Sequence, residues 1–475
     1  MDKIRRKQPL NLTEGSLFKN ILIFSLPLVL SNLLQVLFNM SDVAVVGKFA
    51  GSSALGSVGS TSTLVMLFTG FLIGIGSGIN SLVARYIGER DDEAVASTVR
   101  ASAVVSVCSG LIISVLGISL SKPFLLLLNT KPELLDGAVL YIRIYFCGMP
   151  ALAVYNFGNG VFSADGDTKR PLIFLGAAGI INILLNLLFV IVFKMSVAGV
   201  ALASIISQYI SASLILIALF RTKRPYRLKL RGFKVSGEKV KSILVLGVPA
   251  GFQNAIFAIA NLFIQAGVNS FDTVMVEGNS AAANTDALVY DVMSAFYMAC
   301  TSFISQNFGA GNRDRILKSF FISLIYSFGI GLVVSMLLLL FGNQFLSLFT
   351  NDGEVVEAGM KRLTIMCFSY AFSAFMDCSI AASRGLGKTI IPTVIVIMGS
   401  CVFRIIWVYT VFAYFKTIPS LYLLYIFSWV ITAVAETAYF AVIYKKTINK
   451  MKEAALQAQQ TEEPQSECGL EASEG

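Results

Sequence analysis

The sequence contains no histidine, and only 14% of its 475 residues are charged. Without histidine there is no histidine-based catalytic triad, metal site or proton relay, so any proton transfer must use carboxylates. So little charge cannot cover the surface of a soluble protein of this length. The seven cysteines are scattered and form no CxxC pair, which argues against a disulfide framework. We therefore predict neither a metal site nor a cofactor.

Apolar runs dominate the chain, which is 56% hydrophobic. Each run is long enough to cross a hydrocarbon layer of roughly 30 Å as a helix. The pattern predicts an all-α membrane protein with twelve transmembrane helices. The predicted spans are 21–47, 55–84, 101–120, 139–163, 172–193, 197–220, 243–269, 279–308, 320–341, 363–383, 391–415 and 420–444.

The distribution of lysine and arginine predicts the orientation of these spans. If the N-terminus is cytoplasmic, 28 of the 37 basic residues fall in cytoplasmic segments. Arg404 is the one that lies deep within a predicted span, since Arg143 is only four residues from the outer end of the span 139–163. This asymmetry predicts a multi-pass protein of the bacterial inner membrane with both termini in the cytoplasm. It also explains the net charge of +9 without a nucleic-acid partner. The first apolar run is too long for a cleavable secretory signal.

An internal repeat divides the chain into two halves. A shift of about 221 residues aligns Pro27 with Pro249 and Gly88 with Gly309. Because each half has an even number of spans, the halves insert in the same orientation, as two parallel six-helix lobes related by a pseudo-two-fold axis along the membrane normal. The predicted parts are a cytoplasmic N-terminal segment (1–20), an N-lobe (21–220), a basic cytoplasmic linker (221–242), a C-lobe (243–446) and a disordered cytoplasmic tail (447–475).

Asp42 is the most informative charge within a span, because a charge there costs roughly 2.5–3.5 kcal/mol. Asn32, Gln35, Asn39 and Asp42 are spaced three, four and three residues apart and therefore share one helix face. A polar stripe in a membrane helix predicts a bundle interior or a wet cavity. The alternative is that Asp42 sits in water at the outer helix end.

Other polar residues within spans have both functional and structural interpretations. The amides of the seventh span and the pair in the fifth span are expected either to line a cavity or site or to hold helices together. By depth, Arg404 is able to reach Glu436 or Asp377, and a buried structural ion pair is the alternative to a functional role. The amides concerned are Gln253, Asn254, Asn261, Asn182 and Asn186.

Several segments together resemble one transporter family. These are "SLPLVLSNLLQVLFNMSDVAVVGKFAG", "GAGNRDRI", "SADGDTKRP", "SRGLGKTIIP" and "VAGVALASIISQ". They are similar to the multidrug and toxic compound extrusion (MATE) family, in particular its bacterial DNA-damage-inducible-like branch, over roughly residues 15–448. The resemblance implies two six-helix lobes around a V-shaped cavity that rock between two states. It also implies a monomer in the lipid bilayer that exports cationic or amphipathic drug-like molecules in exchange for H+ or Na+.

The resemblance also assigns residues. Asp42 matches the first-helix aspartate that binds the coupling cation, and Asn182 matches an asparagine beside it. Ser204 matches a polar position of the sixth helix, and Tyr141 matches one of the fourth helix. Asn186 stands where many members carry a second aspartate, so the coupling ion stays open between H+ and Na+. The predicted substrate cavity comprises Asn32, Gln35, Asn39, Gln253, Asn254, Asn261, Asp377 and Arg404.

Three other functional classes are less consistent with the sequence. A flippase for lipid-linked saccharides usually has several basic residues facing its cavity, whereas Arg404 is the one basic residue deep within a predicted span. A major-facilitator carrier normally has a Gly-x-x-x-Asp-Arg-x-Gly-Arg loop, which "ARYIGERDDEAV" does not match. The third alternative is an enzyme or a scaffold without transport activity. The sequence contains no phosphate loop, nucleophile elbow or metal-ligand cluster that would support an enzyme.

Overall fold

The structure is a computed structural model that describes residues 9–229, 233–347, 349–350 and 352–467. Parts of the predicted N-terminal segment, linker and tail therefore lie outside the described residues. The first half of the chain forms six spans, the fourth bent and the fifth ending in a π-helical turn. Its helices are α1 Leu17–Phe49, α2 Ser52–Glu89, α3 Asp92–Leu127, α4 Pro132–Phe146, α5 Met149–Ala164, α6 Lys169–Leu187, η1 Leu188–Val192 and α7 Ser196–Arg221.

The second half repeats this plan. Its fifth span is also interrupted by π-helical turns, and its last helix runs on beyond the bundle. Its helices are α8 Gly237–Val268, α9 Thr273–Gly309, α10 Arg313–Leu346, α11 Gly353–Gly385, α12 Ile390–Val396, η2 Ile397–Val402, α13 Phe403–Trp407, η3 Val408–Phe412, α14 Ala413–Phe415 and α15 Ile418–Glu467.

The described residues confirm the predicted membrane architecture. Eleven helices are long and apolar enough to span a membrane, and the α4–α5 pair, bent by 45°, makes a twelfth. The π-helical segments η1 and η3 occupy matching places in the two halves, as duplication predicts. The first helix of each half also starts in the same way, because Ser16 accepts a bond from the backbone N–H of Lys19 and Ser236 from that of Lys239.

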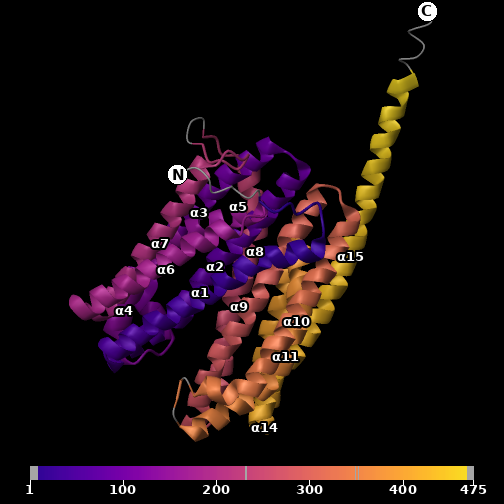
Figure 1. The fold of residues 1–475 in the computed structure, drawn as a ribbon. Coiled ribbons are helices and arrows are strands. Elements are labelled where there is room, and N and C mark those ends of the chain that lie inside the picture. Colours follow the sequence, from indigo (N-terminus) through magenta and orange to yellow (C-terminus); the bar gives the residue numbers. More distant parts are fainter. Residues whose placement is uncertain (1–8, 230–232, 348, 351, 468–475) are drawn as a thin grey trace, which may run out of the picture.

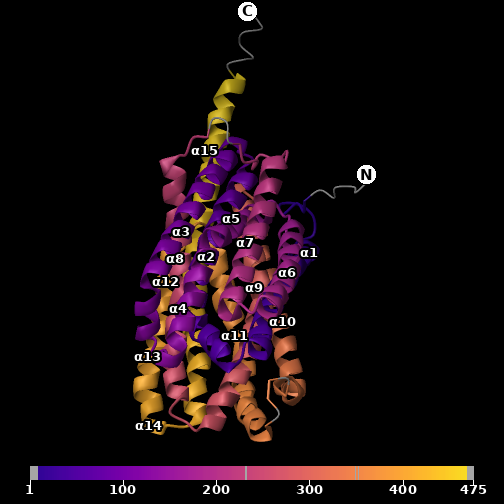
Figure 2. The same cartoon turned by 90° about the vertical axis from the view of Figure 1, so that its left-hand side faces the viewer.

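The two lobes meet at the end of the bundle that carries both termini and separate towards the opposite end (Figure 1). Figure 2 shows the same bundle from the side of the N-lobe. We call the end that carries both termini the terminal end. There, Ser81 of α2 bonds to Ser305 of α9 at 3.0 Å, and Arg384 Nη1 of α11 bonds to Ser77 Oγ of α2 at 2.8 Å. A Cβ on Gly309 would overlap the carbonyl oxygen of Arg85. The seal between the lobes therefore depends on close backbone approach.

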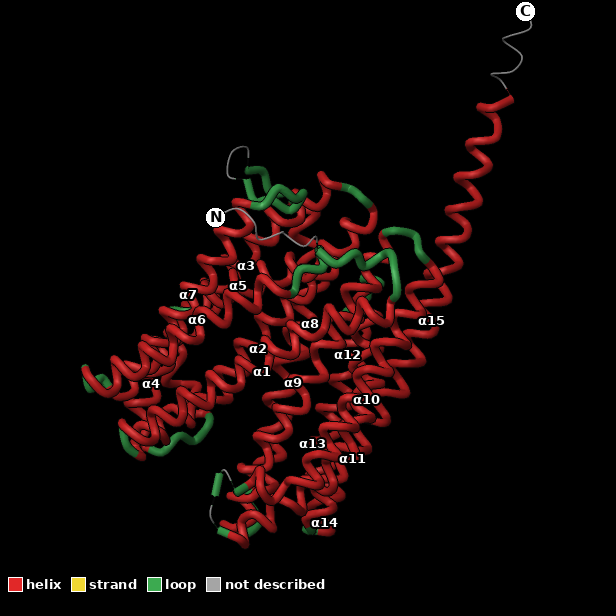
Figure 3. Tube along the Cα trace, viewed as in Figure 1, coloured by secondary structure: helices red, strands yellow, loops and turns green. Residues whose placement is uncertain are grey.

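The start of the first helix of each lobe packs against the other lobe. Leu17, Ile21 and Phe24 of α1 are buried in a cluster with Phe296 and Phe303 of α9. In return, the first part of α8 packs against α2, and the N-lobe core cluster includes residues of both helices. Figure 3 shows α1 and α8 running between the two groups of helices. Relative movement of the lobes must therefore involve α1 and α8.

The end of the chain differs from the expected disordered tail. α15 continues as a helix to Glu467 and projects well beyond the terminal end (Figure 1). The segment KEAALQAQQ is rich in residues with high helix propensity. Because it extends a helix already formed in the membrane, it avoids the cost of nucleation. The prediction of disorder from residue 447 was therefore wrong for 447–467.

The interlobe linker docks on the terminal end of the N-lobe through Asp165, which follows α5. Its Oδ2 accepts a hydrogen bond from the buried Tyr226 hydroxyl at 3.0 Å and lies 3.8 Å from Arg224 Nε. Asp167 and Arg170 are the other charged groups that face it. Burial outweighs the attraction of Arg224 and raises the pKa of Asp165 to about 6.

This shift predicts that linker docking depends on pH. Because the pKa of Asp165 is raised in the docked state, docking is strongest below about pH 4 and weakens, by at most roughly 100-fold, as pH rises through about 6. Hydrogen exchange of the 222–229 peptide, corrected for its intrinsic rate, should lose protection over that range. Asp165→Asn should remove the dependence, and the exposed Asp92→Asn should keep it. Protection that is flat with pH in the native protein would contradict this account.

Candidate functional site

Asp42 is the centre of a polar site in the N-lobe. Its Oδ1 accepts a hydrogen bond from Asn186 Nδ2, and its Oδ2 accepts one from Ser204 Oγ at 3.1 Å. Asn186 Nδ2 also donates to Asn182 Oδ1 at 3.2 Å. Three helices, α1, α6 and α7, thus bring together four of the five residues assigned to the cation site.

Tyr141 of α4 is the fifth. It is buried, stacks on Tyr145 with ring centroids 5.9 Å apart, and lies near Asp42. Tyr145 also lies near Asp42 and was not predicted. Its position one helical turn after Tyr141 was the available signal, since residues i and i+4 share a helix face.

The local structure of α6 determines where the side chains of Asn182 and Asn186 point. Asn182 and Asn186 are one turn apart on α6 and are both buried. The π-helical turn η1 begins two residues after Asn186. Such turns occur often at functional sites, because the extra residue changes the direction of the side chains around it.

The site offers oxygen ligands and a single negative charge. The Oδ1 atom of Asn186 is buried and has no hydrogen-bond partner in the described residues. Together with the Asp42 carboxylate it presents the hard oxygens that sodium prefers, and the carboxylate alone suffices for a proton. Within the same residues no group of three or more acidic or cysteine side chains gathers.

The predicted polar stripe of α1 is divided in the structure. Asn32 donates to the backbone oxygen of Asp291 at 2.7 Å and to Ser294 Oγ at 2.9 Å, both on α9. Gln35 and Asn39 are exposed. Only Asp42 takes part in the N-lobe site, whereas Asn32 joins the two lobes.

The predicted cavity residues of the C-lobe lie apart from Asp42. Asn254 donates to the backbone oxygen of Gly70 on α2 at 3.1 Å, Gln253 is buried, and Asn261 is exposed. Asp377 and Arg404 are buried within the lobe. The described residues show no ion pair of Arg404 with Asp377 or Glu436, so the structural pairing considered from the sequence does not form. Ion pairs in those residues are Arg85–Glu89, Arg170–Asp167, Arg224–Asp165, Lys361–Glu357 and Arg362–Asp286.

Arg362 corrects the prediction that Arg404 is the one arginine deep within a span. α11 begins at Gly353, ten residues before the predicted start, and buries Arg362. Its guanidinium donates hydrogen bonds to Asp286 and Asn279 of α9. The ring centroid of Tyr422 lies 5.2 Å from its Cζ atom. The apolar run alone gave no sign of this burial, because the compensating charge comes from another helix.

Breaking this pair should destabilise the C-lobe. Removing one partner of a buried ion pair leaves the other charge uncompensated, at a cost of about 3–5 kcal/mol. We expect Arg362→Met to lower the melting temperature of the purified protein by several degrees. The double variant Arg362→Met with Asp286→Leu should recover most of the loss. A single variant as stable as the native protein would contradict the structural role.

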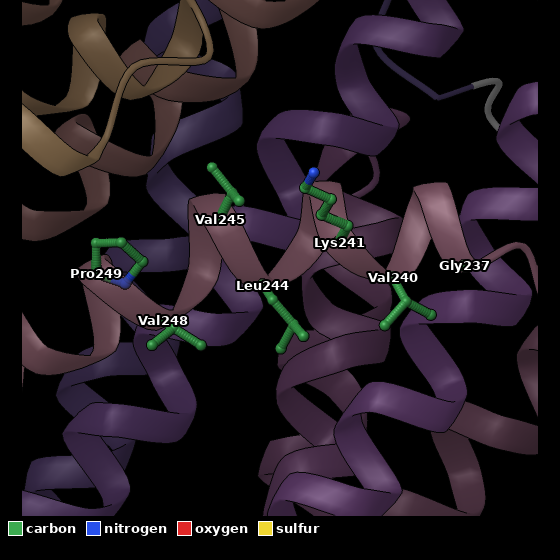
Figure 4. A pocket seen from close by; sticks show the side chains of 7 residues that line it. All are labelled: Gly237, Val240, Lys241, Leu244, Val245, Val248 and Pro249. Atoms are coloured by element: carbon green, nitrogen blue, oxygen red, sulfur yellow. The ribbon is translucent and has the colours of Figure 1, made fainter.

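The surface grooves of the bundle do not coincide with this site. One runs along the start of α8 and another along the outer face of α7. Figure 4 shows the first, in which Lys241 is the one charged side chain among the labelled residues. Both are almost wholly apolar, as expected for surfaces that contact lipid tails. The α8 groove is lined by Gly237, Val240, Lys241, Leu244, Val245, Val248 and Pro249.

Known protein families and relatives match both halves of the internal repeat. The model of the family described as MatE matches residues 27–188 and again residues 249–410, once in each lobe. The chain is 31% identical to a probable multidrug resistance protein, YpnP, of Bacillus subtilis, over 76% of this chain and 80% of that protein. It is 24% identical to an FAD transporter of Shewanella oneidensis, over 71% of this chain and 75% of that protein.

Solved structures share the fold. A MOP superfamily transporter from Pyrococcus furiosus, described as having a binding pocket of reversed polarity, superposes with a TM-score of 0.87 at 22% identity. An outward-facing multidrug resistance MATE family transporter superposes with a TM-score of 0.86 at 22% identity. Each alignment covers 93% of this chain and 99% of the other. The two-lobed architecture is therefore a known transporter fold.

Proposed function

Because the chain belongs to the multidrug and toxic compound extrusion (MatE) family, we propose that it is a secondary active exporter of small cationic or amphipathic organic compounds in exchange for protons or sodium ions. The main observation in support of ion exchange is the Asp42 site, where the carboxylate accepts hydrogen bonds from Asn186 and Ser204 inside the N-lobe. The names of the relatives support small molecules as cargo. A flippase for lipid-linked saccharides is not favoured by these names.

The proposed mechanism is alternating access. The terminal end, sealed by contacts such as Ser81–Ser305, faces the cytoplasm of a bacterial cell, and the lobes separate on the outer side. A cation that enters from outside binds Asp42 and changes the packing of α1, which touches both lobes. The ion drives exchange because it binds one lobe arrangement better than the other. A single chain is sufficient, since each half of the repeat supplies one lobe.

The coupling ion can be identified in proteoliposomes. Purified protein would be reconstituted in vesicles loaded with ethidium, and either a proton gradient or a sodium gradient would be imposed alone. We expect one of the two gradients to accelerate dye movement several-fold over protein-free vesicles. Equal movement with and without either gradient would reject secondary active exchange.

A further inference from the structure

Arg404 of α13 is a buried arginine without a carboxylate partner. Only 2% of its surface is exposed, and its Nε donates to Ser428 Oγ at 3.1 Å. Its Nη2 is buried and has no hydrogen-bond partner in the described part of the chain. Asp377 lies near enough to interact with Arg404 but forms no ion pair with it in the described residues. A buried guanidinium without a directly bonded counter-charge costs several kcal/mol, so its presence requires an explanation.

The same lobe shows how a purely structural arginine is held. Arg362 is equally buried, but Asp286 neutralises it and Asn279 accepts a second hydrogen bond. Arg404 has no such pair. Arg362 also has one buried nitrogen without a partner in the described residues, its Nε, so what distinguishes Arg404 is the lack of a carboxylate bonded to its guanidinium.

Three aromatic rings surround Arg404, whose Nη2 has no hydrogen-bond partner in the described residues. The centroids of Tyr425, Phe257 and Trp429 lie 4.5, 5.7 and 5.7 Å from its Cζ atom. Such cation–π contacts contribute roughly 0.5–2 kcal/mol each, but they supply no hydrogen-bond acceptor. The in-plane N–H donors still need an acceptor, and two parallel bonds to an oxyanion match their geometry best.

This aromatic cage borders the helix that faces the other lobe. Phe257 lies on α8 one turn after Asn254, which bonds to α2 of the N-lobe. Gln253 Oε1 and Asp377 Oδ2 are also buried without partners in the described residues, and Asp377 interacts electrostatically with Arg404. A ligand that brings an oxyanion to Arg404 and a hydroxyl or N–H group to Asp377 would satisfy both.

We propose that Arg404 and its aromatic cage form a substrate subsite for aromatic acids, in which the guanidinium binds a carboxylate or sulfonate and the rings contact the apolar part. This proposal rests on the proposed exporter function and adds a substrate class to the cationic and amphipathic compounds. Asp42 has no part in it, so the ion site and the acid subsite are separable.

The position of tryptophan allows a direct binding test. The chain has two tryptophans, Trp407 and Trp429, and only the second belongs to the cage. In a Trp407→Phe background, Trp429 fluorescence would be titrated with 4-phenylbutyrate and 4-phenylbutylamine, which share ring and chain but differ in charge. We expect phenylbutyrate to bind at least tenfold more tightly. Arg404→Gln should abolish this preference, and Arg404→Lys should keep part of it.

A matched control is available in the N-lobe. Arg143 also donates through Nε to a serine hydroxyl, that of Ser121 at 3.0 Å, so Arg143→Gln should leave the preference unchanged. The proposal is overturned if the protein with native Arg404 binds the amine as tightly as the acid, or if Arg404→Gln retains the preference. If Arg404→Gln does not fold, the first comparison and Arg404→Lys decide. Ethidium exchange in the same preparations tests the exporter function separately.

Discussion

Asp42→Asn should insert and fold normally yet lose ion-driven dye exchange almost completely. The amide has nearly the same shape as the carboxylate, but it carries no negative charge and takes no proton near neutral pH. Without a differential interaction of the ion with the two lobe arrangements, the gradient cannot bias them. Initial rates of ethidium movement in proteoliposomes should fall to the level of vesicles without protein.

The control for this prediction is an aspartate in the same lobe. Asp136 of α4 is exposed, so Asp136→Asn makes the same chemical change away from the site and should leave the rate within about twofold of native. Native rates in Asp42→Asn would remove Asp42 from the mechanism.

The second large effect concerns the seal at the terminal end. Gly309→Ala places a methyl group against the carbonyl oxygen of Arg85 on the other lobe. Because backbone lies on both sides, the clash is relieved only by separating the lobes, and overpacking of this kind costs about 1–3 kcal/mol. That cost shifts the equilibrium towards the terminal-end-open arrangement by roughly 5- to 150-fold. Dye exchange should fall correspondingly, since one state of the cycle is depleted.

The shift can be read from thiol labelling. A cysteine at Ser305, which bonds to Ser81 in the sealed interface, should react faster in Gly309→Ala than in the native background. Gly329→Ala on α10 is the control, because a methyl there meets no atom within 4 Å. Equal labelling and native exchange in Gly309→Ala would show that the seal is more compliant than its geometry indicates.

The architecture could be predicted because it depends on local features of the sequence. Span length, basic residues between spans and a constant repeat offset each need no knowledge of tertiary contacts. The early start of α11 was missed because Arg362 is tolerated there only through Asp286, 76 positions away in the chain. The bend between α4 and α5 and the π-helical turns were missed for a similar reason, since neighbouring helices fix them.

The candidate site was predictable in part. Helical spacing placed Asn182 and Asn186 on one face, and the family resemblance connected them with Asp42 and Ser204. Spacing alone could not show that Asn32, on the same stripe as Asp42, bonds to α9 of the other lobe. That contact depends on how α1 crosses between the lobes, which no single helix encodes.

The central claim is that an ion bound at Asp42 changes the relative position of the lobes. Spin labels at Glu133 and Glu354, both exposed at the open end, would report their separation by electron–electron resonance, with the native cysteines replaced. Addition of the coupling ion should shift the distance distribution in the native background and leave it unchanged in Asp42→Asn. The same shift in both proteins, or no shift in the native one, would contradict the account.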